Sequence, residues 1–200
     1  MHADNRGLDR GNCSAATASS DRRNLFNLTV VAQTPRFSNN AVRIVATGWS
    51  ASVIYRYSSG QPLTILSGLD QALDGFSQQR ANQISANTAS AYQGSACANA
   101  APCISWLNPV AFAQPALGTI GNIGTYNVLG PHFFQFDVAL SRQFRIIEGH
   151  RIEVRAEAFN LTNSVRFNNP GTTLSTPSTF GNILSAQDPR IMQMAMKYTF

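Results

Sequence analysis

The sequence predicts an all-β fold, an antiparallel meander of about five or six long strands. Three observations support this prediction. Apolar and polar residues alternate with a period of two in several runs, which is typical of strands with one apolar and one polar face. Charged residues make up only 12% of the 200 residues, and small polar residues are abundant instead. No run approaches the roughly 18 consecutive apolar residues of a membrane-spanning helix.

The first two strands are expected near residues 22–34 and 42–66. In the first run, apolar residues from Phe26 to Ala32 alternate with polar ones, and Thr34-Pro35 ends it. A short turn is expected to follow. In the second run the apolar face carries the aromatic residues Trp49, Tyr55 and Tyr57. Aromatic residues at this face suit the interfacial girdle of a membrane β-barrel.

The next two strands are expected near residues 132–146 and 150–162, joined by a tight turn at Glu148-Gly149. A helix is excluded for the second of these runs because it would leave no continuous apolar face at 100° per residue. As a strand, this run places four charges of alternating sign on one face. We interpret them as a lumen-facing charge ladder in which the charges neutralise each other, and it comprises Arg151, Glu153, Arg155 and Glu157.

The last strand is expected near residues 189–200. Every second residue of this stretch is apolar or aromatic, and the residues between them are small or polar. The apolar set comprises Met192, Met194, Met196, Tyr198 and Phe200. An edge strand with such an apolar face can add to another sheet by β-augmentation.

Two long segments, 67–131 and 163–187, are rich in Gly, Ala, Ser, Asn and Thr and are expected to be loops. Connections between strands therefore alternate between short and long, as in outer-membrane barrels with short inner turns and long outer loops. The expected strands also match the ~9–11 residues that a tilted strand needs to cross a bilayer. Since the smallest single-chain barrels have about eight strands, we expect the chain to be the carboxy-terminal part of a larger barrel, incomplete and open when alone.

The amino-terminal residues lack the basic and apolar regions of a signal peptide. An extracytoplasmic chain that begins in this way is expected to be a fragment or a truncated reading frame.

Of the three cysteines, Cys97 and Cys103 lie in one small-residue loop and could form a disulfide in an oxidising compartment, although two free thiols stay an alternative. Cys13 is left over.

Other function classes find little support in the residues. The net charge is +5, but the arginines are spread along the chain rather than concentrated, so we expect no nucleic-acid binding. Asp70 and Asp74 are too few carboxylates for a calcium site, and we expect no metal or cofactor. No catalytic constellation emerges, and we expect no enzyme. A secreted or surface β-sandwich that acts as a binding or adhesion module is the alternative, since sandwich strands alternate as well.

Several short stretches, taken in order, resemble the carboxy-terminal barrel of the Oar-like TonB-dependent receptors of Gram-negative bacteria. They are Asp21–Asn24, Gly48-Trp49, Ser59–Thr64, Trp106–Pro109, Ala111-Phe112, Leu129–Pro131, Phe136–Ser141 with Phe144, Arg155–Asn163 and Asp188–Phe200. Each is weak alone, and the ordered set is more specific.

The resemblance implies a barrel of about 22 strands in the outer membrane that takes up bulky ligands. It implies that the set from Met192 to Phe200 is the signal read by the barrel-assembly machinery. The implied partners are outer-membrane lipid, that machinery, and TonB. TonB would act only through a plug that this sequence does not contain, so transport by the chain alone is not expected. The residues do not identify the transported ligand.

Overall fold

The computed structural model describes residues 22–91, 93–97 and 103–200, and these form two compact units. The first, which we name the strand unit, comprises residues 24–58, 133–166 and 188–200. The second, the loop unit, comprises the described parts of residues 22–23, 59–132 and 167–187. Among the described residues, no helix has the length and apolarity needed to cross a membrane.

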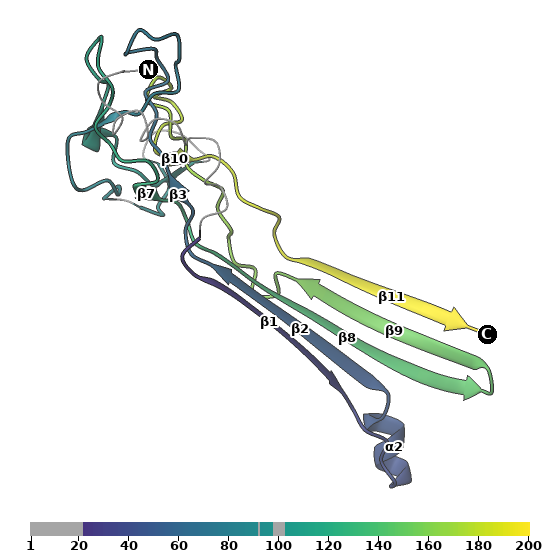
Figure 1. Cartoon of the computed structure of the whole chain (residues 1–200). Coiled ribbons are helices and arrows are strands. Elements are labelled where there is room, and N and C mark those ends of the chain that lie inside the picture. The colour runs from purple at the N-terminus through teal and green to yellow at the C-terminus, as the bar shows by residue number, and fades with distance from the viewer. Residues whose placement is uncertain (1–21, 92, 98–102) are drawn as a thin grey trace. The chain divides into compact units, whose positions relative to one another are not determined.

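The strand unit is one antiparallel sheet of five strands, and it confirms the predicted meander (Figure 1). The order is β1-β2-β8-β9-β11, so each long strand lies beside the next long strand of the chain. This includes the pairs β2–β8 and β9–β11, whose members are separated in the sequence by segments of the loop unit. No other strand of the described residues pairs with the outer edge of β1 or β11. The bounds are β1 (Leu25–Gln33), β2 (Trp49–Ser58), β8 (Phe133–Ile147), β9 (His150–Phe159) and β11 (Ile191–Thr199).

The register of the sheet keeps apolar and polar side chains on separate faces. One row of Cα partners crosses all five strands with apolar residues: Val30, Val53, Val138, Ala158 and Met192. A row on the opposite face carries mostly polar residues: Gln33, Ser50, Ser141, Arg155 and Ala195. The two-residue period seen in each run therefore adds up to a two-faced sheet.

The prediction of a strand over residues 42–66 was wrong at both ends. Helix α2 (Asn40–Ala46) occupies the beginning, because the side chain of Asn39 accepts hydrogen bonds from the amides of Ala41 and Val42 and caps the helix. The connection from β1 to β2 is thus a helix rather than a short turn. At the other end the sheet strand stops at Ser58, and Pro62–Leu63 forms a short strand within the loop unit.

The tight turn between β8 and β9 is present at Glu148-Gly149, where Gly149 adopts a left-handed φ of 84°. A register shift lies between Arg145 and Ile147, next to this turn. Strand β9 ends at Phe159, three residues earlier than predicted. Its end follows from Asn160, whose φ of 52° takes the chain out of the extended conformation.

The segments predicted as long loops, 67–131 and 163–187, contain a packed core. The loop unit has short two-stranded sheets that pair β3 (Pro62–Leu63) with β7 (Val128–Leu129), β4 (Asn82–Gln83) with β6 (Phe112–Ala113), and β5 (Ile104–Ser105) with β10 (Asn182–Ile183), and a 3-10 turn η2 (Pro109–Ala111). Its core includes Ile65, Leu107 and Ile123, each at most 2% exposed. Phe112 and Phe180 meet edge to face with ring centroids 5.7 Å apart.

Two further features stabilise the loop unit. Cys97 and Cys103 are joined in a disulfide, with their Cα atoms 5.5 Å apart. Asp70 and Asp74 both accept hydrogen bonds from the side-chain amide of Gln79, a residue that is fully buried. Backbone amides also donate to these carboxylates. The amide nitrogen of Gly75, for example, lies 2.8 Å from a carboxylate oxygen of Asp70. These carboxylates therefore hold the loop backbone in place.

Candidate functional site: a two-faced sheet with a buried polar network

The apolar face of the sheet has aromatic side chains at both ends and aliphatic ones between. At one end lie Phe26, Tyr55 and Phe136, whose successive ring centroids are 6.0 and 6.5 Å apart. At the other end Trp49 and Phe144 flank Arg142, whose guanidinium carbon is 5.1 and 4.6 Å from their ring centres. Tyr198 lies in the same row as Phe144, because both have Ile152 as a Cα partner.

The spacing of these aromatic groups fits a bilayer. The first aromatic end also includes Phe134, which lies two residues from Phe136 on the same face of β8 and is the Cα partner of Tyr57. From Phe134 to Phe144 strand β8 advances about 33 Å, given its rise per residue. At the tilt of ~40° usual in membrane barrels this is a height of about 25 Å, which equals the height of their outward-facing apolar band. Aromatic girdles flank that band at both interfaces in such barrels.

The apolar face is solvent-exposed in the isolated chain. Val30 is 46% exposed, Val154 44%, Met194 87% and Met196 76%. The strand unit contains this one sheet and no second sheet packed on it, as a β-sandwich would need. An apolar surface of this extent marks a site of interaction with another hydrophobic phase or partner.

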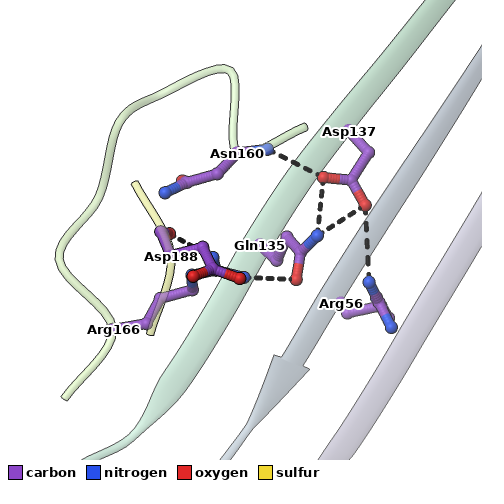
Figure 2. Close-up of polar contacts among 6 residues, drawn as sticks. All are labelled: Arg56, Gln135, Asp137, Asn160, Arg166 and Asp188. Atoms are coloured by element: carbon purple, nitrogen blue, oxygen red, sulfur yellow. Dashed lines mark hydrogen bonds and ion pairs between the residues drawn. The ribbon is translucent and has the colours of Figure 1, made fainter. Parts of the chain in front are cut away.

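The opposite face contains a buried polar network, shown in Figure 2. Its centre is Asp137 on β8, which is 7% exposed. Both carboxylate oxygens accept from the Nε2 of Gln135 at 2.8 Å, and one also accepts from the backbone amide of Asn160 at 2.9 Å. Arg56 on β2 approaches the other oxygen at 3.4 Å and forms an ion pair with it.

This set of donors explains why a buried carboxylate is tolerated there. A buried carboxylate is costly unless it is paired and hydrogen-bonded, and Asp137 has both an ion pair and three hydrogen bonds from neutral groups. The side chain of Arg56 is 48% exposed, so its ion pair is partly screened by solvent. The hydrogen bonds from buried groups therefore contribute more to this arrangement than the charge pair does.

The network continues into the chain that leads from β9 to β11. Arg166 is 8% exposed, donates to the Oε1 of Gln135 at 2.6 Å and also donates to the carbonyl of Asp188 (Figure 2). Asn160 is fully buried, and its side chain forms a pair of hydrogen bonds with the backbone of Ser164 at 3.0 and 3.1 Å. Four parts of the strand unit are thus tied together: β2, β8, the turn after β9, and the residues before β11.

The charge ladder lies on the same face as this network. Arg155 forms an ion pair with Glu157, and Glu157 also accepts from Gln193 of β11. Glu153 is the Cα partner of Lys197 across the same strand pair. Opposite charges at such positions support strand pairing. Arg151 lies at the far end of the ladder, beside other arginines described below.

The apolar set of the terminal strand lies on the apolar face of β11. All residues of β11 are exposed, and Phe200 is 89% exposed. Met192, Met194, Met196 and Tyr198 are the Cα partners of Ala158, Ala156, Val154 and Ile152 on β9.

In the described ranges, no group of three or more His, Cys, Asp or Glu side chains could hold a metal ion.

The sequence did not reveal the polar network as a site. Its members come from distant parts of the chain, with Arg56 and Asp137 separated by 81 positions. The available signal was the occurrence of Gln135 and Asp137 next to each other on the polar face of one strand. It could not show that Asn160 and Arg166 would cover them, since the course of the turn depends on the left-handed backbone at Asn160.

Comparison with known families decides between the barrel and the sandwich. The family model described as "Outer membrane beta barrel domain" matches residues 2–193. The chain belongs to this family. No curated protein and no solved structure matches the chain. As an outer-membrane β-barrel domain, it is located in the outer membrane of a Gram-negative bacterium.

Membership in this family assigns the two faces of the sheet. In outer-membrane barrels the apolar face contacts lipid and the polar face lines the interior. The Asp137 network and the charge ladder both lie on the polar face of the sheet. The open edges of β1 and β11 fit a barrel segment, because an unpaired edge in lipid would leave backbone groups unsatisfied at a cost of several kcal/mol each.

Proposed function

We propose that this chain is the carboxy-terminal wall segment of an Oar-like TonB-dependent receptor that takes up bulky ligands. The single observation that carries the proposal is the buried polar network on the interior face. It joins the strands to the turn that leads from β9 to β11 and so fixes one side of a polar interior. The ordered motifs shared with the receptors support the same conclusion, and the network explains one of them, since Asn160 lies within it.

The large loop unit supports a role in ligand uptake. It has its own core and disulfide, and its two long segments belong to the connections that leave the sheet after β2 and after β9. These two connections begin at the same end of the sheet because neighbouring strands are antiparallel. We infer that this is the outer end, so that the Glu148-Gly149 turn and the end of β11 lie on the periplasmic side.

The proposed partners follow from this placement. Outer-membrane lipid contacts the apolar face. The barrel-assembly machinery reads β11 with Phe200, and TonB acts through a plug that must be supplied by another part of the receptor.

In the full receptor, Phe200→Ala is expected to lower the level of protein in the outer membrane, as measured by immunoblotting of fractionated membranes. Thr199→Ala, on the other face of β11, is the matched control, and equal levels of the two variants would contradict the assembly role.

The uptake function is tested in cells that carry the full receptor. We expect accumulation of one member of a panel of bulky labelled compounds, such as oligosaccharides, peptides and iron chelates, to depend on both the receptor and TonB. Replacement of residues 67–131 by a short Gly-Ser linker is expected to abolish accumulation while the barrel still assembles. Accumulation that is independent of TonB would overturn the assignment.

A further inference from the structure

Five arginines surround one pocket of about 560 Å³ in the strand unit, at the end where β8 and β9 meet. They come from the connection between β1 and β2 and from the β8–β9 hairpin: Arg36, Arg43, Arg142, Arg145 and Arg151. Arg151 is also the last member of the charge ladder, whereas the other four belong neither to the ladder nor to the polar network. The pocket is also lined by the aromatic side chain of Phe144 and by Ile44 of α2.

The pocket exists because the strands of the sheet end at different heights. Strand β2 begins at Trp49, whose Cα partner is Arg142, but β8 continues for five further residues to Ile147. Gly48 turns the chain away from the sheet with a φ of 84°, and a Cβ at this position would lie 2.7 Å from the carbonyl oxygen of Gln143. Helix α2 is thereby directed beside the protruding part of β8.

No carboxylate of the described residues forms a salt bridge with the arginines around the pocket. The ion pairs of the described residues involve Arg56 and Arg155 instead. Arg145 and Arg151 are direct Cα partners across the hairpin, and like charges in such positions destabilise a strand pair. The Nε of Arg142 is buried without a hydrogen-bond partner, while its Nη2 donates to the carbonyl of Ile44. This arrangement calls for an anion.

The surroundings indicate which kind of anion fits. Trp49 and Phe144 belong to the aromatic end of the lipid-facing surface, and Arg142 lies between their rings. Val42, Ile44 and Val45 on α2 are 43%, 71% and 67% exposed, so this short helix also presents apolar side chains. A ligand here would meet guanidinium groups at its polar end and an apolar surface beside them.

We propose that this pocket binds the phosphate headgroup of an anionic glycerophospholipid, with the acyl chains along the apolar face of the sheet. Guanidinium groups match phosphate oxygens by paired hydrogen bonds, and basic pockets at a membrane surface recognise anionic headgroups. The proposal rests on the proposed function in one respect, namely that this end of the sheet lies at the periplasmic leaflet. Phospholipid in that leaflet would neutralise the arginines and fix α2 against the membrane.

The fluorescence of Trp49 provides the test, because Trp49 lies beside the pocket. The full chain with Trp106→Phe, which leaves Trp49 as the sole tryptophan, is reconstituted in vesicles that contain either brominated phosphatidylglycerol or brominated phosphatidylcholine. Quenching of Trp49 is expected to be stronger with phosphatidylglycerol at equal mole fraction. In the double variant Arg43→Gln with Arg145→Gln, the preference for phosphatidylglycerol over phosphatidylcholine is expected to fall by about fivefold for each arginine removed. Arg145→Lys should retain most of it.

The control variant Arg190→Gln removes one positive charge from the other end of β11 and should leave the preference unchanged. Equal quenching by the two lipids in the parent chain would overturn the headgroup site while leaving the membrane placement intact. Quenching by neither lipid would contradict the membrane placement itself and thus the proposed function. Loss of the preference on addition of millimolar inorganic phosphate would show a site for free phosphate and overturn the lipid assignment.

Discussion

The strand unit and the loop unit bury their apolar residues in different ways. The loop unit has a conventional small core, with Ile65 and Ile123 at most 1% exposed, and a disulfide. The strand unit exposes its largest apolar side chains, such as Met194 and Phe200 at 87% and 89%. Its buried side chains are mostly polar, with Gln135, Asp137, Asn160 and Arg166 all at most 8% exposed.

This contrast shows which forces stabilise each unit. The loop unit excludes water from its own side chains, so the hydrophobic effect within it suffices. The strand unit depends on lipid for its apolar face and on internal hydrogen bonds for its polar face. Perturbations should therefore act selectively: changes of the apolar sheet face should depend on lipid, and changes of the disulfide or of Asp74 should be confined to the loop unit.

The largest effect is expected for a charge on the lipid face. Val53→Arg should destabilise the folded barrel by about 2–4 kcal/mol, the cost of arginine near the middle of a bilayer. The neighbouring Ser52→Arg points to the interior and should cost less than about 1 kcal/mol. Unfolding by urea in lipid vesicles measures both. Similar losses for the two variants would contradict the assignment of the faces.

The next effect concerns the polar network. Asp137→Ala should destabilise the strand unit by about 2 kcal/mol, because the Asn160 amide and the Gln135 side chain lose their acceptor in a buried place. Ser141→Ala, on the same face of β8, should change the free energy of unfolding by less than about 0.5 kcal/mol. The same urea titration compares the two. A negligible loss for Asp137→Ala would mean that the network is not a stabilising element.

Removal of the disulfide should affect only the loop unit. The double variant Cys97→Ser with Cys103→Ser opens a loop with a sequence separation of 6, for which chain entropy predicts a loss of about 2 kcal/mol. Limited proteolysis should show faster cleavage within residues 59–132, while cleavage in the sheet keeps its rate. Faster cleavage in both units would show that they unfold together.

The smallest effect is a pH dependence at Asp74. The hydrogen bond from the Phe76 amide lowers the pKa of Asp74 below its usual 3.8. Desolvation opposes this shift, and the hydrogen bond from the Gln79 side chain adds to it. A lowered pKa in the folded state gives stability that is present above pH 3.8 and is lost as the pH falls through the folded pKa. Amide exchange of residues 70–79 should therefore accelerate in that acidic range.

Asp74→Asn provides the control for this pH dependence. It should exchange faster than the parent chain at neutral pH and show little further acceleration in acid. An equal acid response in the two proteins would assign the pH dependence to another group.

The sequence predicted the sheet well because strand periodicity is a local property. In β9 the four charges that alternation assigned to one face are in register with every second residue of β8 from Ala139 to Arg145, and the turn at Glu148-Gly149 was placed correctly. Helix α2 was missed because its apolar residues also fit an alternating run. Asn39 was the signal for it, as an N-cap residue directly before the helix.

The core of the loop unit and the polar network could not be predicted in this way. Ile65, Leu107 and Phe180 lie in short stretches without a regular apolar period, and they meet only through the fold. Arg166 resembles any loop arginine until the turn brings it to Gln135. Such contacts depend on backbone conformations at single residues, which no periodic pattern encodes.

The central claim is that the sheet is a barrel wall with Val138 and Leu140 toward lipid and Ala139 and Ser141 toward the interior. Spin labels at these four positions of a cysteine-free chain in lipid vesicles test it directly, through collision rates with oxygen and with a water-soluble nickel chelate. We predict high oxygen accessibility at positions 138 and 140 and high nickel accessibility at 139 and 141. The same accessibility at all four positions, or the opposite alternation, would contradict the account.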